Sequence, residues 1–266
     1  MAETTTLPRA TGGLRAAVDD TVTMLWRDLI RTARQPEMLV FAVVMGVFFL
    51  VLFNFVFGGA IGAGAEVDYL QFLVPGVLVI TALQGAQQTS MGFAADLVEG
   101  VTDRFRSLPM CQVAVIAGRT LADATRNVIG LILVAALALA MGYRFDSLWG
   151  AVAAIAVATA IGFAFSWLGA AIAAKVRQPD MVGMLSMFWL FPLMLASTAF
   201  TPAETMPSWL RPFAANQPIS VAADAVRGLC EGRTDTPDLL MAAAWAIGLL
   251  AVFVPLSARL YTKDAS

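Results

Sequence analysis

Residues 149–174 read WGAVAAIAVATAIGFAFSWLGAAIAA, a run of 26 residues without a charged side chain. About 20 apolar residues are enough for a helix to cross the hydrocarbon of a bilayer. Within the run, small residues recur at every fourth position: Ala154, Ala158, Gly162, Ser166, Ala170 and Ala174. Such a stripe lets a second helix approach closely. The run therefore predicts a membrane-spanning helix that packs against another helix.

Five further apolar stretches have the same character, and we expect each of them to be helical. One carries two charges in its first turns, Asp123 and Arg126, which can pair at this spacing. The six predicted spans are residues 38–57, 69–95, 121–141, 149–174, 181–200 and 239–256. The predicted fold class is thus an all-α integral membrane protein, with residues 1–266 forming a single transmembrane domain.

The composition excludes several kinds of chemistry. Of the 266 residues, 59% are hydrophobic and 14% are charged, whereas soluble domains carry about 25% charged residues. The absence of histidine excludes a Ser-His-Asp triad and an HExxH zinc site. The two lysines, Lys175 and Lys263, follow alanine and threonine, so the chain has no phosphate-binding loop. We expect no metal, no cofactor and, at a net charge of −2, no nucleic-acid partner.

The basic residues predict the direction of insertion. If both termini are cytoplasmic, 13 of the 17 basic residues lie on the cytoplasmic side, as the positive-inside rule requires. Arginine outnumbers lysine 15 to 2, which points to a GC-rich bacterial genome. We therefore expect a bacterial plasma membrane protein with both termini in the cytoplasm.

Three segments lie between or before the spans. Residues 12–36 alternate apolar and charged positions at helical spacing, which predicts an amphipathic helix in the membrane interface, either an anchor or a lever on the first span. Residues 201–238 are long for a structureless loop, and we expect short interfacial or re-entrant helices there. An apolar face runs from Ile219 to Leu229, and Arg211, Asp224 and Arg227 are candidates for structural ion pairs.

The cytoplasmic loop 96–109 is dense in charges of both signs. Leu97, Val101 and Phe105 share one helical face and leave the charges on the other, which favours a short helix docking on a partner over a solvated loop. The candidate contact residues are Asp96, Leu97, Glu99, Gly100, Asp103, Arg104, Phe105 and Arg106.

No charged residue lies near the middle of any predicted span, although ion-coupled carriers normally need one. The polar residues that are present include Thr81, Gln84 and Gln88 on one stripe, with Gln87 beside it. These amides either cross-link helices or line a substrate path. The candidate path residues are Phe48, Phe53, Asn54, Thr81, Gln84, Gln88, Phe188 and Trp189.

Several short motifs, in this order, resemble those of ABC-2 type permeases, and most of all the daunorubicin-resistance type of drug or lipid exporter. They are Tyr69–Gly76 (YLQFLVPG), Glu99-Gly100 with Arg106–Pro109 (RSLP), Gly142–Phe145 (GYRF), Phe191-Pro192, Phe200–Pro202 (FTP), Met206–Leu210 (MPSWL) and Asn216–Pro218 (NQP). The match covers about Val22 to Lys263. The chain departs from the family pattern at Asp96–Glu99 (DLVE), where many relatives carry an acidic-basic-acidic run.

The resemblance implies a permease subunit that is not itself catalytic. It implies two cytoplasmic ATP-binding subunits that hold the ATP and Mg²⁺, and a second permease, identical or related. The first, second and fifth spans would line a central cavity. Through it the complex would export a hydrophobic or amphipathic drug, antibiotic or lipid. Two alternatives remain: a secondary carrier, ion-coupled or not, which the charge-free span centres disfavour, and an intramembrane lipid-modifying enzyme, which the absence of histidine disfavours.

Overall fold

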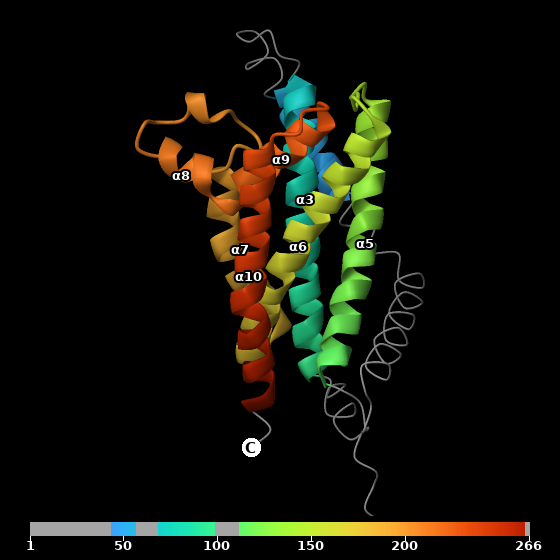
Figure 1. The fold of residues 1–266 in the computed structure, drawn as a ribbon. Coiled ribbons are helices and arrows are strands. Elements are labelled where there is room, and N and C mark those ends of the chain that lie inside the picture. Colours follow the sequence, from blue (N-terminus) through green and yellow to red (C-terminus); the bar gives the residue numbers. More distant parts are fainter. Residues whose placement is uncertain (1–43, 57–68, 99–111, 264–266) are drawn as a thin grey trace, which may run out of the picture.

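The computed structural model describes residues 44–56, 69–98 and 112–263, and every regular element in these ranges is a helix (Figure 1). This confirms the predicted all-α class. A first helix spans Val44–Val56. The labelled helices are α3 (Tyr69–Val98), α5 (Gln112–Ala140), α6 (Leu148–Val176), α7 (Pro179–Leu195), η1 (Ala203–Thr205), α8 (Arg211–Asn216), α9 (Pro218–Cys230) and α10 (Thr236–Lys263).

Four of these helices are long and apolar enough to cross a membrane: α3, α5 from Leu121 onward, α6 and α10. Two shorter apolar helices, Val44–Val56 and α7, lie where the first and fifth spans were predicted. The protein is therefore a multi-pass membrane protein. The count of six spans and the direction of insertion stay predictions.

Two helices, α3 and α7, end at other residues than the predicted spans do. Asp96 and Leu97 were predicted in the cytoplasmic loop, but both belong to the last turns of α3. The helix continues there because Leu97 packs against the buried cluster around Phe93 and Val182. The other helix, α7, ends at Leu195 instead of residue 200.

The early end of α7 is stabilised by hydrogen bonds to its last carbonyl groups, which have no partner within the helix. The Ser197 hydroxyl donates to the Met194 carbonyl at 2.6 Å, and the Ala196 amide donates to the Pro192 carbonyl. Three other helices begin earlier or end later than predicted: α5 begins at Gln112, α6 covers Leu148–Val176 and α10 covers Thr236–Lys263.

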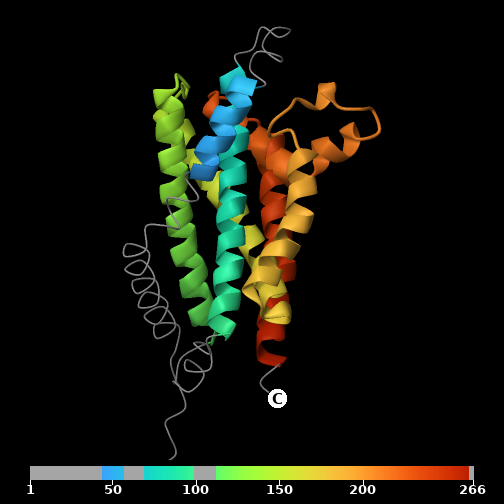
Figure 2. The ribbon, with the colours of Figure 1, turned by 180° about the vertical axis from the view of Figure 1, so that it is seen from behind.

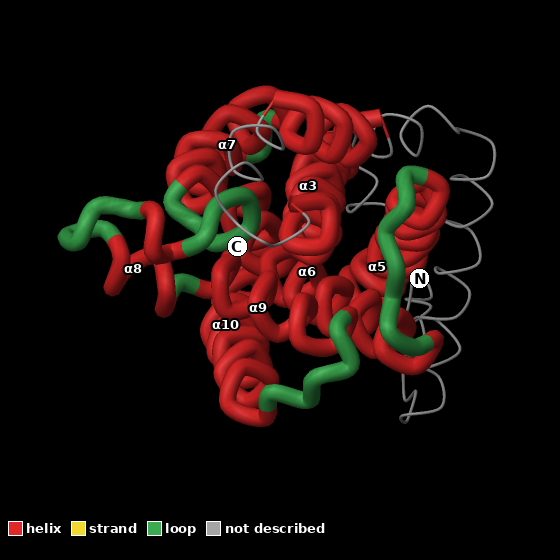
Figure 3. The backbone as a smooth tube through the Cα atoms, turned by 90° about the horizontal axis from the view of Figure 1, so that it is seen from above, coloured by secondary structure: helices red, strands yellow, loops and turns green. Residues whose placement is uncertain are grey.

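The core is built around α3, which packs against α5, α6, α7 and α9 (Figure 3). The small-residue stripe of α6 is buried along its whole length, from Ala154 to Ala174, which confirms the predicted close packing. At Gly162 a Cβ atom would lie 2.8 Å from the Ala82 carbonyl oxygen of α3. Small side chains are therefore what allows the two helices to approach.

The helix α9 closes one end of the bundle, where it packs against α3, α6 and α10 (Figure 1). It begins at Pro218, and the Gln217 side chain accepts a hydrogen bond from the Ile219 amide as its N-cap. Ile219, Ala222 and Val226 are fully buried. This confirms the apolar helical face that the sequence predicts between Ile219 and Leu229.

Candidate substrate path and coupling region

The polar stripe on α3 serves two different purposes. The Thr81 hydroxyl is buried and donates to the Val77 carbonyl of its own helix at 2.8 Å. The Gln87 amide donates to the Gly183 carbonyl of α7 at 3.2 Å, so here an amide cross-links two helices as predicted. Gln84 and Gln88 are half-buried, and their place in a substrate path stays a prediction.

The helix Val44–Val56 lies against α3, and the view from behind shows it in blue in front of that helix (Figure 2). A Cβ atom at Gly46 would lie 3.1 Å from the Thr81 hydroxyl oxygen, so the contact is close. Phe53 stacks on Phe200 with ring centroids 4.2 Å apart. Asn54 beside it is half-buried.

The other aromatic candidates do not converge on one cavity within the described part of the chain. Phe48 and Phe188 are 51% and 82% exposed, so both face outward from the single chain. Trp189 instead turns inward and stacks on Phe165 of α6, with ring centroids 5.6 Å apart. A path shared by Phe48 and Phe188 would therefore have to be closed by lipid or by another subunit.

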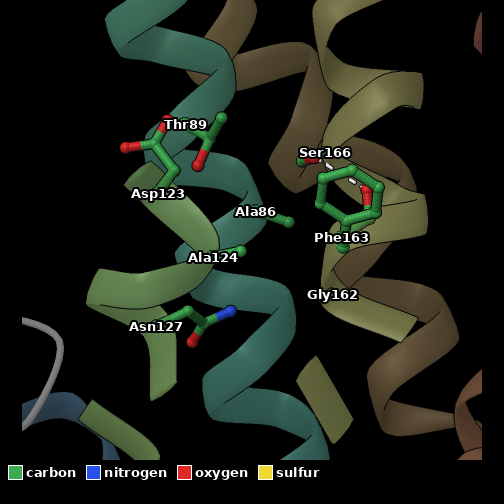
Figure 4. Close-up of a pocket in the computed structure, with 8 residues that line it drawn as sticks. All are labelled: Ala86, Thr89, Asp123, Ala124, Asn127, Gly162, Phe163 and Ser166. Carbon is green, nitrogen blue, oxygen red and sulfur yellow. Dashed lines mark hydrogen bonds between the residues drawn. The ribbon is translucent and has the colours of Figure 1, made fainter. Parts of the chain in front are cut away.

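A small crevice opens between α3, α5 and α6 (Figure 4), with an empty volume of about 180 Å³. Its lining residues are Ala86, Thr89, Asp123, Ala124, Asn127, Gly162, Phe163 and Ser166. Thr89 and Asp123 lie at one end of it and Asn127 at the other (Figure 4). Much of this space is open to solvent, so the crevice alone does not enclose a drug-sized cargo.

Asn127 of α5 makes a hydrogen bond to α3 and lies beside α6 at this crevice. Its Nδ2 atom donates to the Ala82 carbonyl of α3 at 2.9 Å. A Cβ atom at Gly85 would lie 2.7 Å from Asn127 Cγ, and one at Gly162 would lie 3.1 Å from its Nδ2 atom. The amide therefore occupies a niche that exists because α3 and α6 each place a glycine there.

The charge pair predicted in the first turns of the third span is present. An Asp123 carboxylate oxygen lies 2.5 Å from an Arg126 Nη atom, and the two side chains are 8% and 18% exposed. The pair neutralises both charges at the edge of the crevice, as an i, i+3 spacing allows.

A second polar cluster ties α9 to the rest of the bundle. Arg227 forms an ion pair with Asp224, and its Nη2 atom donates to the Thr198 carbonyl at 3.1 Å. Its guanidinium carbon lies 3.9 Å from the centre of the Phe72 ring, a cation–π contact. Burial raises the pKa of Asp224 above its usual value, although Arg227 and the Thr198 hydroxyl lower it. Of the three candidates for ion pairs, Asp224 and Arg227 are confirmed.

The third candidate, Arg211, has a different role. It donates to the Glu204 and Met206 carbonyl oxygens at 2.9 and 3.4 Å.

The Tyr69–Gly76 motif of α3 packs against the turn that follows α7. The Tyr69 hydroxyl donates to the Phe200 carbonyl at 3.0 Å. A Cβ atom at Gly76 would lie 2.0 Å from the Ala199 carbonyl oxygen, so only glycine fits this position without a backbone shift. The Gly142–Phe145 motif is a tight turn after α5 in which Gly142 has a φ of 105° and Tyr143 is buried.

Most of the predicted coupling residues lie outside the described residues: Glu99, Gly100, Asp103, Arg104, Phe105 and Arg106. Asp96 and Leu97 are described, and they form part of α3. Residues 99–111 therefore connect α3, which ends at Val98, with α5, which begins at Gln112.

The architecture defines a class: a multi-pass, all-helical membrane subunit whose sequence carries no nucleotide-binding loop. Residues 19–230 match the family described as ABC-2 type transporter. The chain is 38% identical to the daunorubicin resistance ABC transporter permease protein DrrB1 of Streptomyces coeruleorubidus over 92% of this chain and 87% of that protein. The chain therefore belongs to the ABC-2 type transporter family.

Two more distant relatives agree with this assignment. The chain is 26% identical to the probable doxorubicin resistance ABC transporter permease protein DrrC of Mycobacterium tuberculosis, over 95% of this chain and 92% of that protein. It is 21% identical to the putative transport permease ycf38 of Cyanophora paradoxa, over 80% of this chain and 74% of that protein. As a permease subunit, the chain is the non-catalytic membrane component of an ABC transporter, which implies ATP-binding partner subunits.

Sequence reasoning missed Asn127 and its glycine niche. Asparagine in an apolar helix was a usable signal, because an amide in hydrocarbon needs a partner. The identity of that partner could not be found from the sequence, because Gly85 and Gly162 are 42 and 35 residues away along the chain.

Proposed function

We propose that this permease exports a hydrophobic or amphipathic compound, such as a drug, an antibiotic or a lipid, from the cytoplasm or the inner leaflet. Membership of the ABC-2 family carries the proposal, and the resistance named in two of its relatives supports a drug as cargo. The charge-free centres of the spans agree with it, because an energy source other than an ion gradient is then required.

The proposed assembly contains two cytoplasmic ATP-binding subunits, which hold ATP and Mg²⁺, and a second permease, identical or related. The outward-facing aromatic residues Phe48 and Phe188 support a path completed by another subunit, because neither is covered within this chain. We place the assembly in a bacterial plasma membrane with both termini of this chain in the cytoplasm, as the distribution of basic residues favours.

We assign the contact with the ATP-binding subunits to Asp96, Leu97, Glu99, Gly100 and residues 103–106. Two structural features support this assignment: α3 runs to Val98 without a break, and α3 packs against α5, α6, α7 and α9. A displacement of the segment after Val98 would act directly on the most buried of the four long candidate spans. The segment is thus well placed to transmit a motion of the ATP-binding subunits.

Transport into inside-out vesicles tests the exported class. The chain is co-expressed with its ATP-binding subunit, and uptake of doxorubicin and of a fluorescent phospholipid is followed with ATP and with a non-hydrolysable analogue. We expect ATP-dependent uptake of at least one probe. If ATP drives neither probe, and neither stimulates hydrolysis by the purified complex, the exporter proposal fails; uptake that follows an ion gradient without ATP would support a secondary carrier.

Substitutions in the loop 96–109 separate the coupling of ATP hydrolysis to transport from the assembly of the complex. Glu99→Lys and Gly100→Pro should leave the complex assembled and hydrolysing ATP while transport per ATP hydrolysed falls. Glu231→Lys is the matched control, because this exposed acid lies at the end of α9, far along the bundle from the end of α3 (Figure 1). Unchanged transport per ATP in both variants would contradict the assignment of residues 96–106.

A further inference from the structure

A segment that we call the side arm leaves the bundle between α7 and α9. It consists of residues 201–216, with η1 and α8 as its two short helices. Seen from the side and from above, the side arm extends away from the other helices next to the ends of α7 and α10 (Figures 1 and 3). Because α10 is long and apolar enough to span a bilayer, the side arm lies beside one end of a predicted span.

The side arm is folded on itself and fastened to the bundle. Arg211 Nη2 donates to the Glu204 carbonyl at 2.9 Å, which joins α8 to η1. The Thr205 hydroxyl donates to the Pro202 carbonyl at 2.7 Å. At its far end the Trp245 indole of α10 donates to the Asn216 carbonyl at 3.3 Å. The side arm is therefore a built element with a fixed place beside α10.

Despite this internal order, the side arm exposes its two aromatic residues. Trp209 is 77% exposed and Phe213 is 52% exposed. Trp209 lies two residues after Pro207, and Phe213 directly follows Pro212. Tryptophan is enriched where hydrocarbon meets headgroups, because its ring is apolar and its N–H needs a polar partner. Two exposed aromatic rings at the end of a span therefore match the chemistry of the interfacial layer.

The charges of the side arm decide which kind of contact it makes. Residues 201–216 contain one acid, Glu204, and one base, Arg211, so the segment is neutral. One guanidinium nitrogen of Arg211, Nη2, already donates to two backbone carbonyl oxygens within the side arm. Attraction to anionic lipid requires clustered basic residues, which the side arm lacks. Contact with a membrane would thus come from its aromatic rings.

We propose that the side arm is a lipid-binding element that lies in the headgroup layer beside the bundle, with Trp209 and Phe213 inserted among phospholipids. It holds the start of α9 at a fixed depth, because Gln217, the N-cap of α9, directly follows Asn216. With both termini cytoplasmic, the layer is that of the outer leaflet. The proposal concerns the membrane and does not depend on the cargo or on the ATP-binding subunits.

Fluorescence quenching of Trp209 tests the depth of the side arm. The full chain is reconstituted in nanodiscs of phosphatidylcholine brominated either close to the headgroup or near the chain end. The spectrum of Trp209→Phe is subtracted from that of the parent, which isolates the emission of Trp209. Phenylalanine at this exposed position leaves the fold intact and remains apolar. Trp167→Phe is the control, since the Trp167 ring is only 6% exposed within the bundle.

We expect the Trp209 emission to lose most of its intensity with the shallow brominated lipid and less with the deep one. Iodide in the buffer should quench it weakly, and phosphatidylglycerol in the nanodisc should change neither result. The Trp167 emission should resist all quenchers. Strong quenching by iodide without quenching by lipid would place the side arm in water and overturn the proposal. Quenching by neither would show that protein, such as a second permease, covers it, and would equally overturn it.

Discussion

The helices α3 and α10 are both candidate spans, yet they occupy opposite environments. In the most apolar window of each, 78% of the residues of α3 are buried, against 11% of those of α10. The less buried helix is the more apolar of the two. In water this order would be reversed, because apolar surface is driven inward. Lipid tails remove that driving force, so close packing and hydrogen bonds decide which helix lies inside.

The residues of α3 show how this works. Gly76 admits the Ala199 carbonyl, Ala82 accepts a hydrogen bond from Asn127, and Gln87 reaches α7. On α10, a Cβ atom at Gly248 would meet no atom within 4 Å. Substitutions of the same chemical kind should therefore differ in their cost in unfolding free energy between the core around α3 and the periphery.

The largest loss of unfolding free energy is expected for Arg227→Ala, in the cluster that ties α9 to α3. The substitution leaves the Asp224 carboxylate without its cation and removes the donors to Phe72 and Thr198. Losing one partner of a buried pair costs about 3–5 kcal/mol of unfolding free energy, and we expect the lower end because the Asp224 side chain is 35% exposed. Thermal unfolding of the purified protein in detergent, followed by size-exclusion chromatography, measures the loss.

The control is Arg233→Ala, which removes a side chain that is 58% exposed together with its ion pairs to Glu231 and Asp235. An exposed pair contributes less than about 1 kcal/mol. Equal destabilisation by the two variants would mean that the cluster around Arg227 is not buried.

The second-largest loss of unfolding free energy is expected for Gly76→Ala. The added methyl group would lie 2.0 Å from the Ala199 carbonyl oxygen, so the turn after α7 must move. Overpacking of this kind costs about 3 kcal/mol. Gly248→Ala on α10 meets open space and should be neutral or stabilising by up to about 1 kcal/mol, because alanine favours helix. The same unfolding assay compares the pair, and a tolerated Gly76→Ala would contradict the close approach.

The sequence predicted much of this arrangement where a pattern is local. The every-fourth-residue stripe of α6 and the apolar face of α9 both lie where they were expected, because helical spacing alone decides which side chains share a face. The pairing of Asp123 with Arg126 was equally local. These predictions needed no knowledge of the neighbouring helices.

The features that the sequence could not predict depend on contacts between distant segments. Asp96 and Leu97 were predicted in the loop 96–109 because that loop is dense in charges of both signs, whereas α3 continues to Val98 and Leu97 packs against the cluster that contains Phe93 and Val182. The place of Phe53 and Trp189 in a substrate path stays a prediction, but their packing on Phe200 and Phe165 could not be predicted. A single sequence contains no signal for such pairs.

A smaller effect is expected for Asn127→Ala at the crevice between α3, α5 and α6. The variant loses the hydrogen bond to the Ala82 carbonyl, and such bonds between membrane helices contribute about 1 kcal/mol. Thr125→Ala is the control, because its hydroxyl bonds only the Leu121 carbonyl of the same helix among the contacts that the structure describes. A melting temperature that falls equally in both variants would show that Asn127 does not join the helices.

The smallest effect is expected on the lipid-facing side of α10. The Ile247 side chain is 66% exposed, so in a membrane it contacts lipid rather than other helices. Ile247→Ala leaves an alanine that also contacts lipid, and it should change the unfolding free energy by less than about 0.5 kcal/mol. Leu78→Ala on α3 is its buried counterpart, at 0% exposure, and the cavity it leaves should cost about 2 kcal/mol. Both variants remove aliphatic carbon from an apolar helix, so hydrophobicity alone predicts similar losses. A loss at Ile247 as large as that at Leu78 would therefore show that another protein surface covers α10, and that the periphery of the single chain is an interface in the assembled transporter.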